Sequence, residues 1–491
     1  MMTNTSGKLA VGVEYSLAIV MAVFLVASPV LAQTSTQPFP TPIAATDKVV
    51  KVNFVEFASL PDIGGHPAQP MLLVDEPSTR RMFVNDIKGP LYSVSYDGRT
   101  VFPYVDINAS AWGVAVVSPT LFRGFQSFAF HPEFSQRGAR GFGKFYTVAD
   151  TSNTNPKADF RPVGWDDNSF YEAIRRHDPA THHSVLLEWT AQNPAAATYD
   201  GGPPRELLRV EQPPGANHNG NQLAFNPLAS RGAADFGMLY ISFGDGYRSD
   251  LAQNLNSIFG KLLRIDPLGS NSTNGKYGIP AGNPFASIST TDTLVEIYAF
   301  GLRNAQRFAW DPNNGNLFLA DIGQSMVEKV TLVTAGANLG WNKWEGSFPY
   351  ISRTEVGVSN RRGDHKITYP IVEYSHKDPL LQRSVAVTLG YVYRASAVPQ
   401  LKNLLLFGDM PSGEIFYVSA DDLPKGGQDP IRRVVFNDKG STRTLLQLVK
   451  EKNVAQGKPE ASRADLRFGL GPNGQILVLN KWDGIIRLIV R

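Results

Sequence analysis

The chain has 491 residues, of which 42% are hydrophobic and 19% charged, a composition typical of a globular protein with a large core. The formal net charge is only +3 and no basic run is interleaved with aromatic residues, so the sequence does not favour nucleic acid as a partner. The absence of cysteine excludes disulfides, thiol catalysis and cysteine-ligated zinc.

The first 32 residues have the pattern of an export signal. Lys8 precedes the apolar run SLAIVMAVFLVA, and SPVLA ends at Ala32 with the small residues that a signal peptidase reads. The run is shorter than the roughly 20 residues that span a bilayer. We expect a signal peptide over 1–32, with an uncleaved membrane anchor as the alternative, and a Pro/Thr-rich linker over 33–48. The expected product is periplasmic or secreted, without a stable membrane span.

Two apolar strands around a Pro/Gly/Asp turn recur six times along the chain. The copies are PMLLVDEPSTRRMFVND, FQSFAFHPEF with GKFYTVAD, NQLAFNP with GMLYISFGDG, QRFAWDPNNGNLFLADIG, VTLGYVYRASAVPQLKNLLLFGD and LRFGLGPNGQILVLN. Each copy predicts an antiparallel hairpin, and such a hairpin buries its faces only by stacking on its neighbours. This repeat predicts an all-β, six-bladed β-propeller over 49–491, with two β-sandwich domains as the alternative. We expect GIIRLIVR, at the C-terminus, to share a blade with VKVNFVEFASL and so close the ring.

A histidine on a glycine-rich turn is the first candidate for chemistry. His218 lies in GANHNGNQLAF, directly before an expected buried strand. An imidazole titrates near neutral pH and serves as a general base, and flexible glycines allow the backbone to place it at the rim of a channel. The alternative is a turn histidine whose hydrogen bonds are satisfied locally.

Two further polar loops adjoin the repeat strands. In GLRNAQRFAW, Arg303, Asn304 and Gln306 stand near a strand start, where the planar guanidinium suits a carboxylate; a surface salt bridge is the alternative. In LADIGQSMVEKV, Asp321 supplies a hard oxygen ligand and Gly323 frees nearby carbonyls, which suits calcium; a solvated turn is the alternative.

Together these motifs resemble the soluble glucose/sorbosone dehydrogenase family, the aldose sugar dehydrogenases that depend on pyrroloquinoline quinone (PQQ). The resemblance rests on FAFHPEF, NHNGNQLAFNP, GDG, LNSIFGKLLRIDP, YGIPAGNPF, EIYAFGLRNAQRFAWDPNNGNLFLADIGQ and NLGW, in this order. It is dense from Phe125 to Trp341 and thinner from GYVYR to the C-terminus. It implies a six-bladed propeller, in agreement with the repeats.

The resemblance also implies site residues. His218 matches the histidine that takes the sugar C1 hydroxyl proton while hydride goes to the quinone, and Arg303 and Asn304 match the pair that lies against the quinone. A calcium ion polarises the quinone in the family, and its loop matches Asp321, Ile322 and Gly323. A basic residue after YVY matches Arg394 and is expected to pair with a cofactor carboxylate.

Three positions depart from the family pattern. Phe122 stands where a glutamine is common, although Gln126 lies close by and is expected to contact the cofactor in its place; Leu339 replaces a tyrosine. Glu414 stands where relatives often carry a basic residue, and an acid there would repel a tricarboxylate.

These observations predict an exported PQQ- and Ca²⁺-dependent sugar dehydrogenase whose substrate is a small sugar and whose electron acceptor the sequence does not identify. A non-catalytic carbohydrate- or ligand-binding propeller of the same fold is the first alternative, favoured by Phe122 and Glu414. A calcium-dependent lactonase is the second, and would need several acids converging on a metal in the channel.

Overall fold

Strands dominate the computed structural model, which describes residues 34–163, 181–288, 292–381 and 384–491. The expected signal peptide, residues 1–32, lies outside these ranges. Within them, no helix is long and apolar enough to cross a membrane. The helical elements described are α2 (Leu445–Ala455) and the 3₁₀ helices η1 (Ser110–Trp112), η2 (Ser249–Ala252), η3 (Pro399–Leu401) and η4 (Pro472–Gly474).

Three antiparallel sheets of four strands take up the middle of the chain. The first contains β7 (Phe125–Phe130), β8 (Lys144–Thr151), β9 (His182–Thr190) and β10 (Arg205–Gln212). The second contains β11 (Gly220–Phe225), β12 (Leu239–Phe243), β13 (Lys261–Ile265) and β14 (Ile297–Phe300). The third contains β15 (Ala305–Trp310), β16 (Leu317–Asp321), β17 (Val327–Val333) and β21 (Val372–Ser375).

A thirteen-stranded sheet joins the two ends of the chain. Its first part is β22 (Val387–Tyr393), β23 (Leu404–Asp409), β24 (Ile415–Ser419) and β25 (Arg432–Asp438), with β26 (Ser441–Arg443) paired to β25. Its second part is β2 (Val50–Ser59), β29 (Ile485–Val490), β28 (Ile476–Leu479) and β27 (Arg467–Leu470). Its third part is β3 (Pro70–Glu76), β4 (Arg81–Asp86), β5 (Pro90–Ser95) and β6 (Val101–Asp106). Short parallel pairings, β25 with β2 and β27 with β3, link these antiparallel parts.

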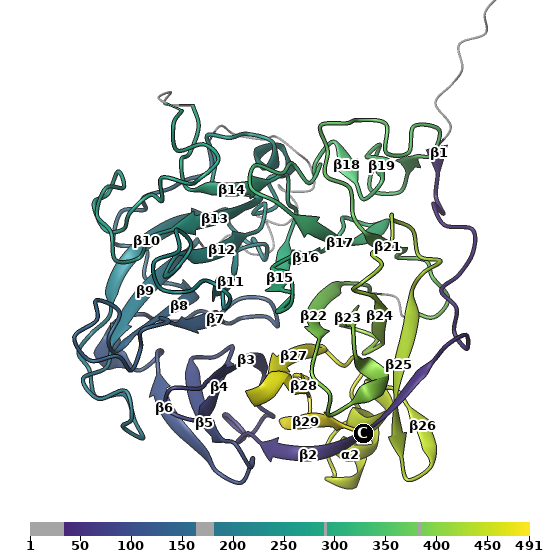
Figure 1. Ribbon diagram of the computed structural model, residues 1–491, viewed down its shortest axis with the longest axis horizontal. Helices are drawn as coiled ribbons and strands as arrows, with labels where there is room; N and C mark the ends of the chain where they lie inside the picture. The colour runs from purple at the N-terminus through teal and green to yellow at the C-terminus, as the bar shows by residue number, and fades with distance from the viewer. Residues whose placement is uncertain (1–33, 164–180, 289–291, 382–383) are drawn as a thin grey trace, which may run out of the picture.

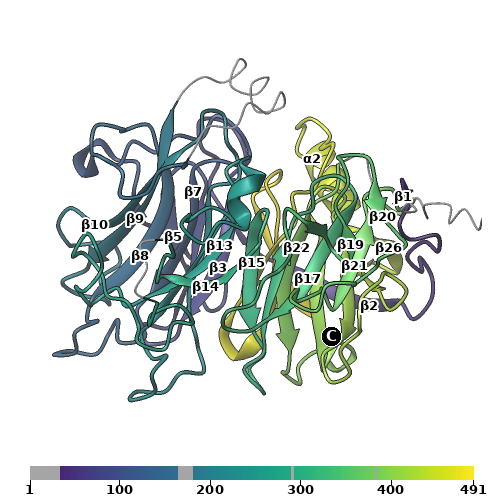
Figure 2. The same ribbon diagram turned by 90° about the horizontal axis from the view of Figure 1, so that it is seen from above.

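All six hairpins expected from the sequence are present. They pair β3 with β4, β7 with β8, β11 with β12, β15 with β16, β22 with β23, and β27 with β28. The first strands of these hairpins contact one another in a closed cycle, in the order β3, β7, β11, β15, β22, β27 and back to β3. The sheets therefore surround a common centre (Figure 1), and β15, β17 and β22 run across the thickness of the ring (Figure 2).

Ring closure joins the two ends of the chain, as the sequence predicted. The C-terminal strand β29 pairs antiparallel with β2, from Asn53 opposite Val490 to Ser59 opposite Ile485. The alternating apolar residues of both strands fill one core cluster with the β3–β4 hairpin. Each apolar side chain buried in this way stabilises the fold by roughly 1.5–3 kcal/mol.

The interfaces between neighbouring sheets hold the rest of the core. One cluster joins the β7–β10 sheet to the β11–β14 sheet through Tyr146, Leu208 and Ile241, and another joins β15–β17 to the β22–β24 region through Phe318 and Phe407. A sheet buries its faces only against the next one, so the stacking inferred from the repeat is what forms the core.

The segment over 33–48, expected to be a linker, packs against the body where it is described. Its strand β1 (Thr34–Ser35) pairs with β20 (Val356–Gly357), close to the β18 (Trp344–Glu345) and β19 (Phe348–Pro349) hairpin. Phe39 and Ile43 are buried, and the Ile43 N–H donates to Asp378 at 2.8 Å. The segment packs against the body because it contains these two apolar side chains among its prolines and threonines.

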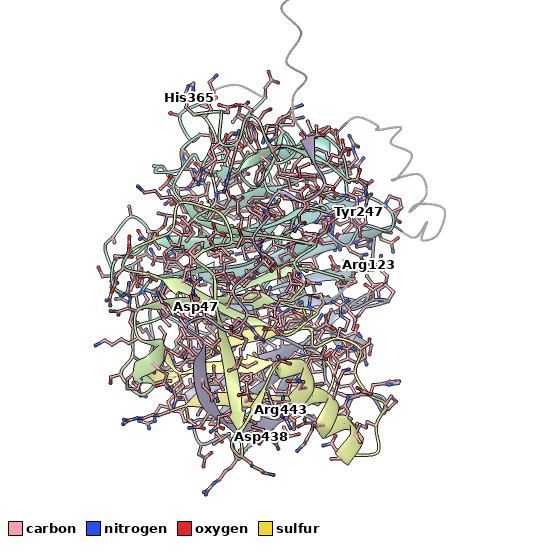
Figure 3. The ribbon with its side chains drawn as sticks, turned by 90° about the vertical axis from the view of Figure 1, so that its right-hand side faces the viewer. Asp47, Arg123, Tyr247, His365, Asp438 and Arg443 are labelled. Carbon is pink, nitrogen blue, oxygen red and sulfur yellow. The ribbon has the colours of Figure 1, made fainter. Side chains whose placement is uncertain are left out.

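Helix α2 lies at the rim beside the β25–β26 hairpin, marked by Asp438 and Arg443 in Figure 3. Thr444 begins the helix with a capping box, because its side chain accepts from the Gln447 N–H while the Gln447 side chain accepts from the Thr444 N–H. Its buried leucines belong to the core cluster that also contains Tyr393 of β22 and Phe468 of β27.

One buried histidine makes the fold sensitive to acid. His131 follows β7, packs edge-on against Phe225 of the next sheet, and accepts the Glu133 N–H through Nδ1. Burial lowers the pKa of His131 from 6.5 to about 4, so the folded state binds fewer protons than the unfolded state between these values. Stability is therefore complete above pH 6.5 and falls as the pH drops towards 4, by up to about 3 kcal/mol.

We expect His131→Asn, which keeps an acceptor for the Glu133 N–H, to reduce this acid sensitivity. Chemical denaturation of the variant at pH 7 and pH 4.5 should show a smaller stability difference than in the wild-type protein. An unchanged difference would mean that other groups govern the acid response.

Candidate active site

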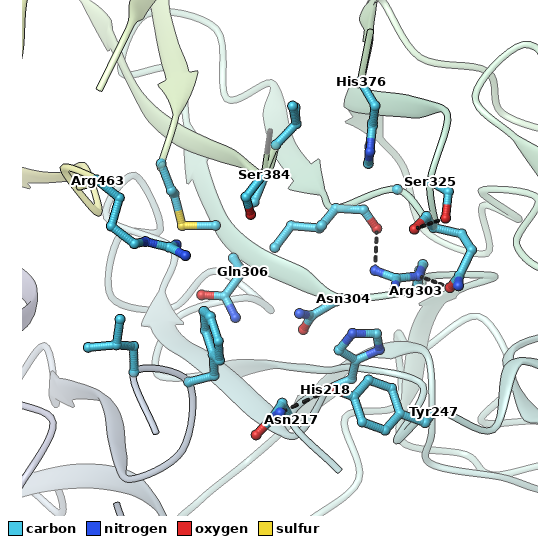
Figure 4. A pocket seen from close by; sticks show the side chains of 18 of the residues that line it. Asn217, His218, Tyr247, Arg303, Asn304, Gln306, Ser325, His376, Ser384 and Arg463 are labelled. Carbon is cyan, nitrogen blue, oxygen red and sulfur yellow. Dashed lines mark hydrogen bonds between the residues drawn. The ribbon is translucent and has the colours of Figure 1, made fainter. Parts of the chain in front are cut away.

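A cavity of about 550 Å³ lies at one end of the central cycle of strands. Side chains before β11, before β15, after β16 and before β22 converge on it (Figure 4). Its size falls within the range of pockets that bind small organic molecules. Seven of the candidate site residues named from the sequence line it: Gln126, His218, Arg303, Asn304, Gln306, Ile322 and Gly323.

His218 reaches this cavity because of the local strand pairing. It stands two residues before β11, and Asp245 stands two residues after β12; Gly220 and Phe243 are paired, so both side chains emerge at the same edge. Gly244 permits the close approach, since a Cβ there would lie 2.7 Å from the His218 backbone. The glycines of NHNG and GDG thus bring an imidazole and a carboxylate together.

The two side chains form a buried dyad. His218 Nδ1 lies 2.6 Å from Asp245 Oδ1, and the two residues are 7% and 2% exposed. Asp245 is fixed in turn, because Oδ2 accepts the Trp341 indole N–H at 2.8 Å and Oδ1 accepts the Tyr247 N–H at 2.9 Å. A carboxylate at Nδ1 favours the tautomer that carries its proton there and leaves Nε2 with a free lone pair.

The surroundings keep His218 neutral. Burial lowers its pKa most, and the neighbouring Arg303 lowers it further; Asp245 opposes both but does not overcome them. Burial disfavours the Asp245 carboxylate as well, yet His218 and its hydrogen bond hold the Asp245 pKa below the ordinary value. The dyad therefore combines an ionised carboxylate with a neutral imidazole able to accept a proton.

Arg303 and Asn304 are positioned by Asp321. The Asp321 carboxylate accepts the backbone N–H of Arg303 at 3.1 Å and that of Asn304 at 2.7 Å, and pairs with Lys329 at 3.2 Å. The Arg303 guanidinium then donates to Gln324 Oε1 at 2.8 Å and lies over the Trp341 ring. The guanidinium is thereby held at the cavity wall, and no carboxylate of the described residues forms an ion pair with it.

This arrangement does not support the expected calcium ligation by Asp321. Its carboxylate is fully buried, is occupied by the partners just described, and does not line the cavity. No group of three or more histidine or acidic side chains suited to a metal occurs in the described ranges. Ile322 and Gly323 do line the cavity, but calcium prefers six to eight oxygens.

Two glutamines face the cavity with unused acceptors. Gln126 donates to the Phe122 carbonyl at 2.7 Å and Gln306 donates to Asn221 at 2.8 Å, while the Oε1 atoms of both glutamines are buried without a partner. Phe122, which replaces the family glutamine, lines the same cavity and is 41% exposed. Buried orphan acceptors are costly, so this wall suits a ligand with hydrogen-bond donors.

Arg394 lies elsewhere, contrary to the expectation that it faces the cavity with Arg303. It is absent from the cavity lining, and its guanidinium bonds both Asp311 oxygens at 2.9 and 2.6 Å. Its Nη1 donates to Asp421 and to Asn403. Ala386, which lines the cavity, precedes the first residue of β22, whereas Arg394 follows the last residue of that strand. A motif match alone could not show that the Arg394 side chain lies at the end away from the cavity.

We expect Arg394→Met to destabilise the fold by about 3–5 kcal/mol, since it leaves the fully buried Asp311 carboxylate unpaired. Chemical denaturation measures the loss, and affinity for a ligand of the cavity should not change. A variant of unchanged stability that binds the ligand more weakly would show that Arg394 contributes to the cavity after all.

The other two departures have structural partners. Glu414 forms a two-pronged ion pair with Arg433 at 2.8 and 2.9 Å and does not line the cavity, so it repels nothing there. Leu339 is buried in the cluster that joins the second and third sheets.

Sequence reasoning missed two arginines at the cavity and the pairing of His376 with Glu328. Arg463 and Arg467 line it from the segment before and at the start of β27, but they flank no polar motif. His376 lines the opposite wall, and its Nε2 lies 2.5 Å from Glu328 Oε1. Glu328 also accepts the Gly323 and Val387 N–H groups, which ties the LADIGQ loop to β22.

The comparisons with known proteins show the family of the chain. The model of the Glucose / Sorbosone dehydrogenase family matches residues 182–441, just over half of the chain, so the chain belongs to that family. HIPL2 protein of Arabidopsis thaliana is 30% identical over 335 residues, which are 63% of this chain and 44% of that protein. Aldose sugar dehydrogenase YliI of Escherichia coli is 30% identical over 205 residues, 42% of this chain and 48% of that one. The matches thus span less than half of these curated relatives.

Solved structures share the fold. The soluble aldose sugar dehydrogenase of Escherichia coli, in its apo-form, has a TM-score of 0.54 at 18% identity and covers 90% of this chain and 97% of its own. The PQQ-bound aldose sugar dehydrogenase of Streptomyces coelicolor has a TM-score of 0.53 at 16% identity, covering 94% and 99%. At such identities the likeness concerns the fold alone.

Proposed function

We propose that the chain is a PQQ-dependent aldose sugar dehydrogenase built as a single six-bladed propeller over 49–491. The closed cycle of six inner strands supports the blade count. The observation that carries the function is the His218–Asp245 dyad at the edge of a cavity that also holds Arg303 and Asn304. Family membership and the relatives named above support sugar oxidation as the chemistry.

The cavity residues fit a flat, anionic quinone. Arg303, Arg463 and Arg467 supply positive charge, Asn304 and Gln126 supply amide groups, and the volume is adequate. We propose that Arg303, Asn304, Arg463 and Gln126 hold PQQ. Arg463, rather than Arg394, would then pair with a carboxylate of the cofactor. Bound PQQ would supply an acceptor for the hydride that leaves the sugar C1 carbon.

The dyad handles the proton that accompanies this oxidation. His218 Nε2 accepts the C1 hydroxyl proton as the carbonyl forms, a contribution of about 10²–10⁴-fold in rate. Asp245 holds the ring in its tautomer and stabilises the imidazolium that results. Tyr247, edge-on to the imidazole at 4.4 Å between ring centres, restricts the ring from the other side.

We propose that the Ile322 and Gly323 carbonyls bind calcium, and the proton transfer to His218 does not depend on this ion. The Asp321 carboxylate positions Arg303 and Asn304 instead. We expect Asp321→Asn to leave calcium affinity within about twofold and to weaken PQQ binding about tenfold, the loss of one charge-assisted hydrogen bond. Competition with a chelating dye measures the first and absorbance titration the second. A large loss of calcium affinity would show that the carboxylate is a ligand.

Export to the periplasm or the medium completes the proposal, with residues 1–32 as the cleaved signal. The sugar would then be the electron donor, and the reduced cofactor would pass its electrons to an external acceptor. Mass analysis of the mature protein tests this part, because cleavage after Ala32 would give an N-terminus at Gln33.

A ligand-binding propeller without redox activity is the second candidate, favoured by Phe122 at the cavity wall. The lactonase alternative lacks support, since the described residues offer no cluster of acids for its metal. The deciding experiment supplies purified protein with PQQ and calcium and follows reduction of an artificial dye by a panel of aldoses. PQQ-dependent dye reduction supports the dehydrogenase, whereas aldose binding without dye reduction supports the binding propeller.

A further inference from the structure

Three buried cations lie in or behind the cavity wall without an ion-pair partner among the described residues. Arg307 on β15, Arg467 on β27 and Lys481 after β28 are 4%, 3% and 2% exposed. None of them has an acidic group within ion-pair distance among the described residues. Of the three, only Arg467 reaches the cavity surface.

Their hydrogen bonds go to main-chain carbonyls. Arg307 donates to the Gln306 and Met71 carbonyls, both at 2.6 Å, and Arg467 donates to the Leu466 carbonyl at 2.8 Å. Lys481 donates to the Leu121 carbonyl. The Arg467 Nε–H is buried with no acceptor at all. Carbonyl dipoles solvate these cations in part, but no carboxylate of the described residues forms an ion pair with any of the three, although Asp465 is near enough to act on Arg467 and Lys481.

The nearest acids are already occupied. Asp465 bonds Arg463 at 2.8 Å through one oxygen and the Trp482 indole at 2.7 Å through the other. Asp86 accepts the Gln69 and Lys88 N–H groups. Neither carboxylate is free to turn towards the three cations.

The charges act on one another. Burial lowers the pKa of Arg307 to about 9, and repulsion from Arg467 adds to this effect. Burial also lowers the pKa of Arg467 to about 10; attraction to Asp465 opposes this effect and repulsion from Arg463 adds to it. Burial and Arg467 lower the pKa of Lys481 as well; Asp465 opposes them, and Arg307 lowers the pKa further. Even if Lys481 gave up its proton, the two arginines would stay charged at pH 7. Buried charge without a counterion costs several kcal/mol per ion.

We infer that the group Arg307, Arg467 and Lys481 binds a small inorganic anion such as chloride, separately from the ligand of the cavity. A larger ligand in the cavity meets Arg467 but not Arg307 or Lys481, which are not part of its surface. A monatomic anion beside the Arg467 Nε–H would accept that unused donor and compensate the charge of all three. The alternative source of negative charge is a carboxylate of an organic ligand that extends from the cavity.

Bromide and chloride test this site on the full protein. Crystals of the cofactor-free protein soaked in sodium bromide should show an anomalous peak beside Arg467 Nε, and the peak should persist when PQQ is added. In solution, the unfolding temperature should rise as chloride replaces methanesulfonate at constant ionic strength. Arg307→Gln should weaken this chloride response at least tenfold in apparent affinity and should not lower stability in chloride-free buffer. Arg231→Gln, at an exposed ion pair, is the control and should keep the full response.

Two results would overturn the inference. No bromide peak together with a stability indifferent to chloride would show that the carbonyls alone accommodate the charges. A bromide peak that PQQ displaces would assign the three cations to an organic carboxylate. Neither result depends on sugar oxidation, so the site and the proposed function can fail independently. If Arg307→Gln does not fold, the bromide map of the wild-type protein decides.

Discussion

His218→Gln should lose most of its turnover, by about 10²–10⁴-fold, while it retains the bound cofactor. Glutamine keeps a polar group of similar reach but does not accept a proton at neutral pH. The effect appears in kcat for aldose oxidation, measured with an artificial dye, and absorbance titration should give an unchanged PQQ affinity.

The control is His365→Gln, which removes a histidine at the periphery of the molecule (Figure 3). The pH profile adds a second readout. Because burial and Arg303 lower the His218 pKa below 6.5, the neutral form is present above that value and activity should fall only at more acidic pH. Wild-type turnover in His218→Gln would make this histidine a structural turn residue.

Arg303→Gln should weaken PQQ binding about 10- to 100-fold, since it removes a charged hydrogen-bonding group from the cavity wall. It should also move the acidic limb of the pH profile to higher pH. Burial is the larger cause of the low His218 pKa and Arg303 the second, so the pKa rises when the positive charge is removed.

Equilibrium titration of PQQ and the pH dependence of kcat measure these two effects separately. Arg231→Gln, at an exposed ion pair remote from the cavity lining, is the matched control. Weaker binding without the pH shift would mean that Arg303 and His218 act on different parts of the ligand. No change in either would remove Arg303 from the site.

Periodicity predicted the fold well because each repeat is a local hairpin whose strands lie close in sequence. The six hairpins and the pairing of β29 with β2 follow from alternating apolar residues and their turns. His218, Arg303 and Asn304 could be predicted together because each lies within two residues of the start of the first strand of a repeat. Equivalent positions in a ring of repeats meet at one end of the central axis.

The remaining site residues depend on side-chain direction, which a motif match does not determine. Arg394 follows β22 at the far end of the strand and meets Asp311. Asp321 points back to the Arg303 and Asn304 amides although its neighbours Ile322 and Gly323 face the cavity. Arg463 and Arg467 come to the cavity only through ring closure, a contact between distant parts of the chain.

Rapid mixing of the PQQ- and calcium-loaded protein with an aldose distinguishes a sugar dehydrogenase from a propeller that only binds its ligand. We expect the absorbance of the bound quinone to bleach in a single turnover, and deuterium at the sugar C1 carbon to slow the bleaching. His218→Gln should bleach more slowly by the factor given above. Tight binding of PQQ without bleaching by any aldose, or bleaching indifferent to C1 deuterium, would contradict the proposed dehydrogenase.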